Sequence, residues 1–433
     1  MRELEEKMYF LNPSNLFDWL KKINSLHTVS MDLSLERALE VANRLEVLRP
    51  TCSVVTVAGT NGKGSTVAGI ESIMLSAGFR VGAFTTPFLF HHNEQIRIQG
   101  KSIDDETLCN AFTVVDKARG DIALTPFEFT TLAAFVIFTQ FDLDLWILEV
   151  GMGGRFDAVN VIDTDIAVVT SIDIDHAEWL GDTREKIGYE KAGIFRKNKP
   201  VVYGDLHPPQ SLIDYAEKLQ SPLFLQGRQF GEKEFFGMTK KEELHWNWWS
   251  EKTLLEYLPI PSLFLQNMSV VLMVIELLQA RLPVSRISID DAFSHLSLPG
   301  RIQSIPGDIN HIVDVSHNPA AISHLSNFLH KNPIKGKTIA VFSMLSDKDI
   351  VGSIETIKNE IDEWFVAPLN LERAASKEQL ISSFRQLNIE NVHFYEVISD
   401  ALVLAMHKTK EDISNNRLVT FGSFKTVAAC CVS

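Results

Sequence analysis

SVVTVAGTNGKGST, residues 53–66, sets the architecture of this chain. An apolar, β-branched run, Ser53–Ala58, stops at a loop rich in glycine, and a helix-like segment, Val67–Ala77, follows at once. A strand, a glycine-rich loop and a helix in this order form a phosphate cradle, because glycines let backbone N–H groups and the helix N-terminus approach an anion closely. The predicted phosphate-binding residues are Gly59, Thr60, Asn61, Gly62, Lys63, Gly64 and Ser65.

The loop departs from the usual pattern GxxxxGK[ST] but keeps its chemistry. Val57 stands where that pattern has its first glycine, and Gly64 separates Lys63 from Ser65. Lys63 would still place a positive charge on the β- and γ-phosphates, and Ser65 or Thr66 could face Mg²⁺ or a phosphate oxygen. The alternative is a glycine-rich turn with a chance lysine, which would not account for the position of the loop between a strand and a helix.

Composition excludes some classes of function. The chain has 433 residues, 45% hydrophobic and 22% charged, as expected for a globular protein of two or three domains. A net charge of −14 argues against a general nucleic-acid binder, which needs a basic surface. A site for anionic substrates would therefore have to be locally positive, and Lys63, Arg155 and Arg301 could provide this charge.

Cysteine usage and hydropathy bear on the cellular compartment. The 4 cysteines show no metal-ligand spacing, which favours a reducing compartment. Residues 1–7 carry charges of both signs and lack the apolar core of a signal peptide. No apolar run approaches the length of about 18 residues that a membrane span needs. We expect a cytoplasmic monomer that contacts neither nucleic acid nor membrane.

Strands and helices alternate along the whole chain, which predicts an α/β protein of parallel sheets covered by helices. A break near residues 296–300 separates a domain with the P-loop-like segment, 1–296, from a smaller Rossmann-like domain, 297–433. Between Phe235 and Tyr257 we expect antiparallel strands whose tryptophans pack rather than bind a ligand. The predicted parallel strands are 53–58, 81–85, 143–150, 165–172, 200–203, 222–225, 310–315, 338–343, 364–367, 392–396 and 417–421.

Unusual polar residues follow several of these strands. Glu149 precedes the turn Gly151–Arg155, Asp175 and His176 follow the next strand, and Asp314 and His317 end the first strand of the second domain. Ligands of open α/β sheets collect at the carboxyl ends of the strands. The sequence therefore predicts an active site for two substrates at these strand ends.

A series of short motifs carries a family resemblance over nearly the whole chain. Together, in this order and spacing, they resemble the dihydrofolate synthase/folylpolyglutamate synthase family of the Mur ligase superfamily. The motifs are Gly59–Ser65, Thr85-Thr86-Pro87-Phe88, Glu149–Arg155, Asp175-His176, Glu190-Lys191-Ala192-Gly193-Ile194, Pro299-Gly300-Arg301, Asp314 with His317-Asn318-Pro319, and Asp347-Lys348-Asp349.

The resemblance implies a Mur-ligase-type fold and an ATP-dependent acid–amino-acid ligase. In this family ATP phosphorylates the carboxylate of a pteroate or folate, and the amine of L-glutamate attacks the acyl phosphate. ADP and phosphate are released. The substrates would be 7,8-dihydropteroate and tetrahydrofolate, with 1–296 holding ATP and the pterin and 297–433 serving as the glutamate ligase domain. Closure of the two domains is also implied.

The resemblance further implies two Mg²⁺ ions near the phosphates. Thr86 and Glu149 would bind one ion, and Glu149 and His176 the other. Lys191, which by itself would be read as a solvated lysine on a helix, corresponds to a lysine that is carbamylated in similar ligases, where the new anion orients the second ion. A monovalent cation is a further cofactor that this resemblance suggests.

Three residues resemble those that meet ATP, and a fourth those that meet the reacting groups. Asn267 offers an amide for adenine, Arg301 a contact to phosphate and Asp314 a contact to ribose. An equal alternative for Asn267 is that it caps the helix 268–282. His317 would help to orient glutamate or the acyl phosphate, as a catalytic residue beside Lys63 and Lys191.

The predicted pterin pocket carries two departures from the family. Pro126 stands where an aromatic residue is frequent, and Phe156 where leucine is frequent. Phe127 would stack on the pterin, and Asp157 would pair with its amino-pyrimidine edge. Because most pocket residues are present, both activities are expected. The predicted substrate-binding residues are Met31, Asp32, Leu33, Thr125, Phe127, Arg155, Phe156 and Asp157.

Two other functions would use the same phosphate loop. One is a Mur-type ligase for a different acid, although such cell-wall enzymes usually carry an extra N-terminal domain and only about 50 residues precede the loop here. The other is a P-loop ATPase without ligase activity. That alternative leaves the motifs of the second domain without a role.

Overall fold

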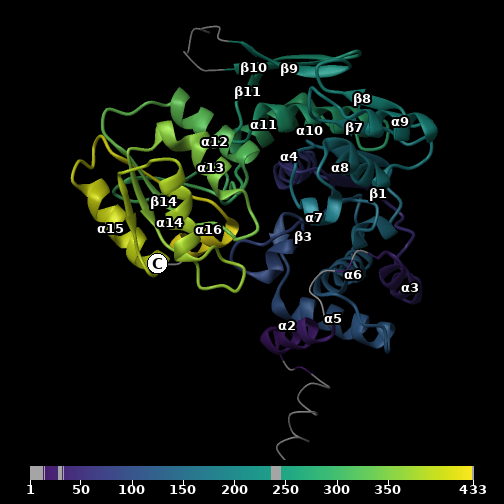
Figure 1. Cartoon of the computed structure of the whole chain (residues 1–433). Helices are drawn as coiled ribbons and strands as arrows, with labels where there is room; N and C mark the ends of the chain where they lie inside the picture. The colour runs from purple at the N-terminus through teal and green to yellow at the C-terminus, as the bar shows by residue number, and fades with distance from the viewer. Residues whose placement is uncertain (1–12, 14, 28–31, 33, 236–244, 432–433) are drawn as a thin grey trace, which may run out of the picture. The chain divides into compact units, whose positions relative to one another are not determined.

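The computed structural model describes residues 13, 15–27, 32, 34–235 and 245–431 (Figure 1). The chain divides into two compact units, Met1–Leu296 and Ser297–Ser433. Each is an α/β unit built on its own parallel-rich sheet. The predicted substrate residues Met31 and Leu33 lie outside the described residues.

The sheet of the first unit has eight strands in the order β4-β3-β2-β5-β1-β6-β7-β8. Strands β2 and β5 to β8 run parallel to β1, whereas β3 and β4 form an antiparallel edge. The central strand β1 is buried along its whole length, as expected when helices cover both faces. The strands are β1 Ser53–Ala58, β2 Val81–Phe84, β3 Ile96–Ile98, β4 Lys101–Ser102, β5 Leu145–Glu149, β6 Ile166–Val169, β7 Val201–Tyr203 and β8 Leu223–Leu225.

The helices of this unit begin at sites that the local sequence explains. Helix α6 starts with Pro126 after a capping box, in which Thr125 accepts from the backbone of Glu128 and the Glu128 carboxylate accepts from the backbone N–H of Thr125. The α-helices are α2 Leu16–Ser25, α3 Glu36–Arg44, α4 Lys63–Ser76, α5 Asp105–Arg119, α6 Pro126–Thr139, α7 Ala177–Leu180, α8 Arg184–Lys191, α9 Gln210–Lys218, α10 Leu265–Leu278 and α11 Arg286–His295; the short 3₁₀ helices are η1 His92–Gln95, η2 Ala158–Val161 and η3 Ala192–Ile194.

Strands β9 Phe230–Phe235, β10 His245–Ser250 and β11 Leu254–Pro259 form a separate antiparallel sheet. Trp246 and Trp248 are fully buried there, and their indole N–H groups donate to the carbonyl oxygens of Pro259 (2.9 Å) and Ser269 (3.1 Å). The prediction that these two tryptophans serve packing is confirmed.

The second unit holds a sheet in the order β12-β13-β17-β14-β15-β16, in which only the edge strand β12 is antiparallel. Its strands are β12 Gln303–Ile305, β13 Asn310–Asp314, β14 Thr338–Phe342, β15 Glu363–Val366, β16 Val392–Phe394 and β17 Arg417–Phe421. Its helices are α12 Pro319–Lys331, α13 Ile350–Ile357, η4 Lys358–Glu360, α14 Lys377–Gln386, α15 Ile398–Lys410 and α16 Phe424–Cys431. Within the described ranges, no helix has both the length and the apolar character needed to cross a membrane.

Candidate active site

The glycine-rich loop is fixed against the end of a neighbouring strand. It joins β1 to α4, and the segment after β6 lies beside it because β1 and β6 are paired. The Thr60 N–H donates to the Ser171 carbonyl (2.8 Å), and Thr170 Oγ1 donates to the Asn61 carbonyl (2.6 Å). A Cβ on Gly59 would collide with the Thr170 side chain, so this contact requires glycine. The loop is therefore held in shape by the protein itself.

Lys63 is the first residue of helix α4. The expectation that Lys63 lies in the loop and the helix begins near Val67 is wrong, because the left-handed Gly62 (φ 87°) turns the chain directly into the helix. Lys63 Nζ donates to the Gly59 carbonyl (2.9 Å) and the Thr60 carbonyl (3.1 Å). The ammonium group thus lies over the loop at the helix N-terminus, where an anion is favoured.

Asn267 lies beside the same loop. A Cβ on Gly62 would be 2.5 Å from Asn267 Oδ1. The helix-cap alternative for Asn267 is wrong, because Phe264 occupies the N-cap of α10 and no side chain caps the helix. Asn267 is instead in the first turn of α10. Its predicted contact with adenine stays a prediction.

Glu149 and Thr86 meet at the carboxyl ends of β5 and β2. Glu149 is 3% exposed, and its Oε2 accepts from the Thr86 N–H (3.2 Å). A Cβ on Gly64, in the first turn of α4, would lie 3.7 Å from Glu149 Oε2. A buried carboxylate, a threonine and the start of helix α4 are therefore adjacent.

His176 precedes helix α7 in a left-handed conformation, φ 51°, which is uncommon outside glycine. Its ring Nε2 lies 4.0 Å from Asp175 Oδ2, and its backbone N–H donates to Asp175 Oδ1 (2.9 Å). Among the residues that the structure describes, no three His, Cys, Asp or Glu side chains are grouped so as to hold a metal ion.

Lys191 is buried, 3% exposed, so its interpretation as a solvated lysine is wrong. Burial, and next the positive charge of Lys63, lower the pKa of Lys191 to about 7, while Asp175 and Asp157 act in the opposite direction. Burial likewise raises the pKa of Asp157 to about 6, against hydrogen bonds from backbone N–H groups and the charge of Lys63. These four charged groups therefore share one electrostatic environment.

The predicted pterin residues divide into two groups. Phe127 and Asp157 both lie beside Gly151, where a Cβ would be 2.7 Å from the Phe127 ring and 3.3 Å from Asp157 Oδ2. Asp157 also caps η2 by accepting from the Val159 N–H (3.0 Å), and Thr125 caps α6.

The other members of the pterin set lie in different surroundings. The Arg155 guanidinium stacks 4.0 Å from the Tyr189 ring, Phe156 is 45% exposed, and Asp32 pairs with Arg37 (2.8 Å). Of the described residues of the set, the structure thus brings Phe127 and Asp157 together.

In the second unit, Phe424 brings two predicted residues together. The Arg301 guanidinium lies 4.9 Å from the Phe424 ring, and the His317 ring lies 6.2 Å from it. The Asp314 carboxylate accepts from the N–H groups of Ile302 and Ser316, both at 2.9 Å, so it orders the strand end. No sequence motif pointed to Phe424, since a single aromatic residue near the C-terminus has no distinctive spacing.

Two family matches cover most of the described chain. Residues 57–223 match the family described as Mur ligase middle domain, and residues 300–424 match the family described as Mur ligase, glutamate ligase domain. The phosphate loop, Glu149, His176 and Lys191 fall in the first match, and Arg301, Asp314 and His317 in the second.

Curated proteins and solved structures with the same architecture are also similar over nearly the full chain. The dihydrofolate synthase/folylpolyglutamate synthase of Escherichia coli K12 is 39% identical over 415 residues, covering 96% of this chain and 94% of that protein. A structure of E. coli FolC in complex with DHPP and ADP has a TM-score of 0.88 at 38% identity, covering 96% and 97%. A bifunctional folylpolyglutamate synthase/dihydrofolate synthase with Mn, AMPPNP and L-glutamate bound has a TM-score of 0.87 at 39% identity, with the same coverage.

Proposed function

Because this chain belongs to the dihydrofolate synthase/folylpolyglutamate synthase family of Mur ligases, we propose that it joins L-glutamate to 7,8-dihydropteroate and to tetrahydrofolate. The reaction uses ATP and a divalent metal ion and releases ADP and phosphate through an acyl-phosphate intermediate. The observation that carries the proposal is the phosphate loop, with Lys63 over its carbonyls and the buried Glu149 beside the first turn of α4.

Each part of this site has a chemical task. The loop N–H groups and the N-terminus of α4 bind the phosphates of ATP, and Lys63 places a cation on the phosphoryl group that is transferred. On transfer, a carboxylate oxygen of the pteroate or folate bonds to the γ-phosphorus while the bond to ADP breaks. The glutamate amine then attacks the acyl carbon, loses a proton and displaces phosphate.

Two metal ions are proposed, one held by Thr86 and Glu149 and the other by Glu149 and His176. The carboxylate of Glu149 and the hydroxyl of Thr86 fit Mg²⁺, which proteins commonly bind through one or two carboxylates together with substrate phosphates and water. The imidazole of His176 is an uncommon ligand for this ion. When bound, the ion neutralises the charge that develops on the phosphoryl oxygens. Glu149 is kept in position for this role by the hydrogen bond from the Thr86 N–H.

We propose that Lys191 is carbamylated. The neutral amine attacks CO₂, a nitrogen–carbon bond forms, and one proton is released to solvent, which leaves an anionic carbamate. Burial of Lys191 supports this, because a dry amine loses its proton readily. The carbamate would relieve the repulsion from Lys63 and help to orient the metal ion.

Phe127 and Asp157 are proposed to bind the pterin, by stacking and by hydrogen bonds to its amino-pyrimidine edge. Their common position beside Gly151 supports a shared pocket. For Met31, Asp32, Leu33, Thr125, Arg155 and Phe156 the same role stays a prediction. Asn267, Arg301 and Asp314 are proposed to contact ATP, and His317 glutamate or the acyl phosphate.

A monovalent cation, a monomeric state and a cytoplasmic location also stay predictions. Turnover in buffers with and without potassium would test the requirement for a monovalent cation. Sedimentation measurements would test the monomeric state.

Phosphate release from ATP tests the function directly. The purified chain is assayed with Mg²⁺ and every pairing of dihydropteroate, tetrahydrofolate or no acid with L-glutamate, another amino acid or no amine. Turnover should require glutamate together with either pteridine acid. Turnover with a different acid would favour another Mur-type ligase, and turnover that needs neither substrate would favour an ATPase without ligation.

A further inference from the structure

Two backbone segments of the first unit pack against each other more closely than side chains would allow. A Cβ on Gly154 would lie 3.0 Å from the carbonyl oxygens of Glu190 and Lys191, and a Cβ on Gly193 would lie 2.5 Å from Arg155 Cα. The Arg155 N–H donates to the Glu190 carbonyl across this contact (2.9 Å). The turn before Asp157 and the segment that carries Lys191 are therefore joined backbone to backbone.

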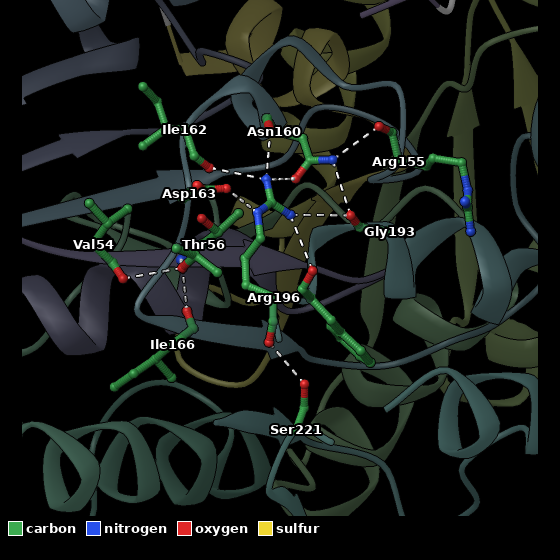
Figure 2. A network of polar contacts seen from close by, with 12 residues as sticks. Val54, Thr56, Arg155, Asn160, Ile162, Asp163, Ile166, Gly193, Arg196 and Ser221 are labelled. Carbon is green, nitrogen blue, oxygen red and sulfur yellow. Dashed lines mark hydrogen bonds and ion pairs between the residues drawn. The ribbon is translucent and has the colours of Figure 1, made fainter. Parts of the chain in front are cut away.

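Hydrogen bonds from the side chains of Arg196 and Asn160 hold the two segments together, as Figure 2 shows. Arg196 Nη2 donates to the backbone oxygen (2.8 Å) and to Oδ1 (3.0 Å) of Asn160, and Nη1 donates to the Phe195 carbonyl (3.2 Å). The Asn160 amide in turn donates to the carbonyls of Arg155 (3.0 Å) and Gly193 (3.1 Å). An ion pair between Arg196 and Asp163 holds the guanidinium on its outer side.

The contact reaches two residues of the proposed mechanism. Asn160 lies in η2, the turn that Asp157 caps, and Arg196 follows η3, which starts directly after Lys191. Displacement of Arg196 would therefore shift the Asp157 turn and the Lys191 segment relative to each other.

We propose that Arg196 and Asn160 are positioning residues, a clamp that fixes Lys191 against the Asp157 turn in the productive arrangement. This inference rests on the proposed function, in which Asp157 contacts the pterin and Lys191 carries a carbamate. In this proposal Arg196 and Asn160 act through Lys191 and Asp157 rather than on the substrate or the metal ion directly.

Arginine suits this task for a geometric reason. Its planar guanidinium offers five N–H donors in a rigid fork, so one side chain reaches carbonyls on both segments at once. Lysine keeps the charge and the ion pair with Asp163, but its three N–H donors share one nitrogen and cannot span both segments. The variant Arg196→Lys should therefore fold, but the turn before Asp157 and the segment that carries Lys191 should no longer be held in their relative positions.

The experiment compares Arg196→Lys and Asn160→Ala with wild type and with Arg417→Lys. Arg417 is the control, because its guanidinium likewise donates to a backbone carbonyl, that of Asn332 (2.9 Å). Arg417 is buried, whereas Arg196 is partly buried, and Arg417 is the first residue of β17, at the end of the strand away from its carboxyl end. The measurements are kcat, KM for dihydropteroate, the dependence of kcat on dissolved CO₂, and the thermal unfolding temperature.

Both clamp variants should raise KM for dihydropteroate by about tenfold and lower kcat at ambient CO₂ by about as much, since small misplacements are costly in such sites. Raised CO₂ should restore part of the lost kcat. Arg417→Lys should change the unfolding temperature but leave KM and the CO₂ dependence as in wild type.

The inference is overturned if both clamp variants keep the wild-type KM and CO₂ dependence, whatever their unfolding temperature. If the turnover of wild type does not depend on CO₂, the CO₂ measurement cannot test the clamp. KM for dihydropteroate in the clamp variants then decides whether the inference holds. Failure of wild type to ligate dihydropteroate would instead contradict the proposed function.

Discussion

Asn267, in the first turn of α10, lies directly against Gly62, the left-handed glycine that ends the phosphate loop. This contact joins a distant helix to the loop and gives Gly62 two reasons to be glycine: its φ of 87° and the space that Asn267 occupies.

Gly62→Ala should raise KM for ATP by about tenfold or more, because the new methyl group displaces Asn267 and strains the loop. The left-handed conformation alone costs an alanine roughly 1 kcal/mol. Gly78→Ala is the control, since Gly78 has a similar φ of 86° but no atom within 4 Å of its added Cβ. Equal KM values for the two variants would contradict a functional contact at Gly62.

Lys63→Ala should abolish turnover, a loss of roughly a hundredfold or more, because the transferred phosphoryl group loses its fixed cation. The fold should persist, because the Nζ hydrogen bonds to the Gly59 and Thr60 carbonyls lie within the loop itself. Lys199→Ala is the control, because it removes an ion pair between Lys199 and Asp165. Asp165 directly precedes β6, at the end of that strand away from the loop, so this variant should keep wild-type activity. A Lys63 variant with near wild-type kcat would show that the loop does not bind the reacting phosphate.

Asn267→Ala should weaken ATP binding and reduce the preference for ATP over GTP, because the amide would no longer contact adenine. KM for both nucleotides is the measurement. Gln266→Ala, next on the same helix, removes instead a hydrogen bond to the Gly204 carbonyl (2.6 Å) and should leave the nucleotide preference unchanged. An unchanged preference in the Asn267 variant would assign that residue to packing of the loop alone.

Lys191 should take up isotopically labelled CO₂, and more of it as the pH rises through about 7. Below that pKa the buried amine is protonated and has no lone pair for CO₂; above it the neutral amine predominates. Carbon-13 NMR at fixed dissolved CO₂ measures the carbamate. Lys191→Ala should lose the signal, whereas a variant of the exposed Lys186 should keep it. A wild-type protein without any signal at pH 8 would rule out carbamylation.

Phe127→Leu should raise KM for dihydropteroate by about three- to tenfold, since a stacked ring contributes roughly 1 kcal/mol beyond its buried area. Phe156→Leu should have a smaller effect, because Phe156 is 45% exposed and departs from the family residue at that position. Initial rates with both acids give the comparison. A larger effect at Phe156 would shift the pterin pocket toward the exposed turn.

The type and position of most elements followed closely from local patterns in the sequence, whereas the order of the strands in each sheet came from the tertiary structure. The bounds of β1 and β17 agree with the predicted 53–58 and 417–421, because buried parallel strands are short apolar runs with polar ends. Helix starts were predicted less accurately. Helix α4 begins at Lys63, because Gly62 takes a left-handed conformation that places Lys63 and Gly64 in the first turn, and no local sequence pattern indicates this.

The features of the candidate site also divide into those that the sequence determined and those that only the tertiary structure decided. The sequence alone determined the glycine-rich loop between β1 and α4, the strand-end Glu149 and the family, because those signals lie in contiguous residues whose spacing is specific. The tertiary structure decided that Asn267 meets Gly62, that Lys191 is buried beside other charges, and that Arg196 joins two loops. These properties depend on burial and on contacts between segments far apart in the chain, which are set only when the sheet and its helices pack.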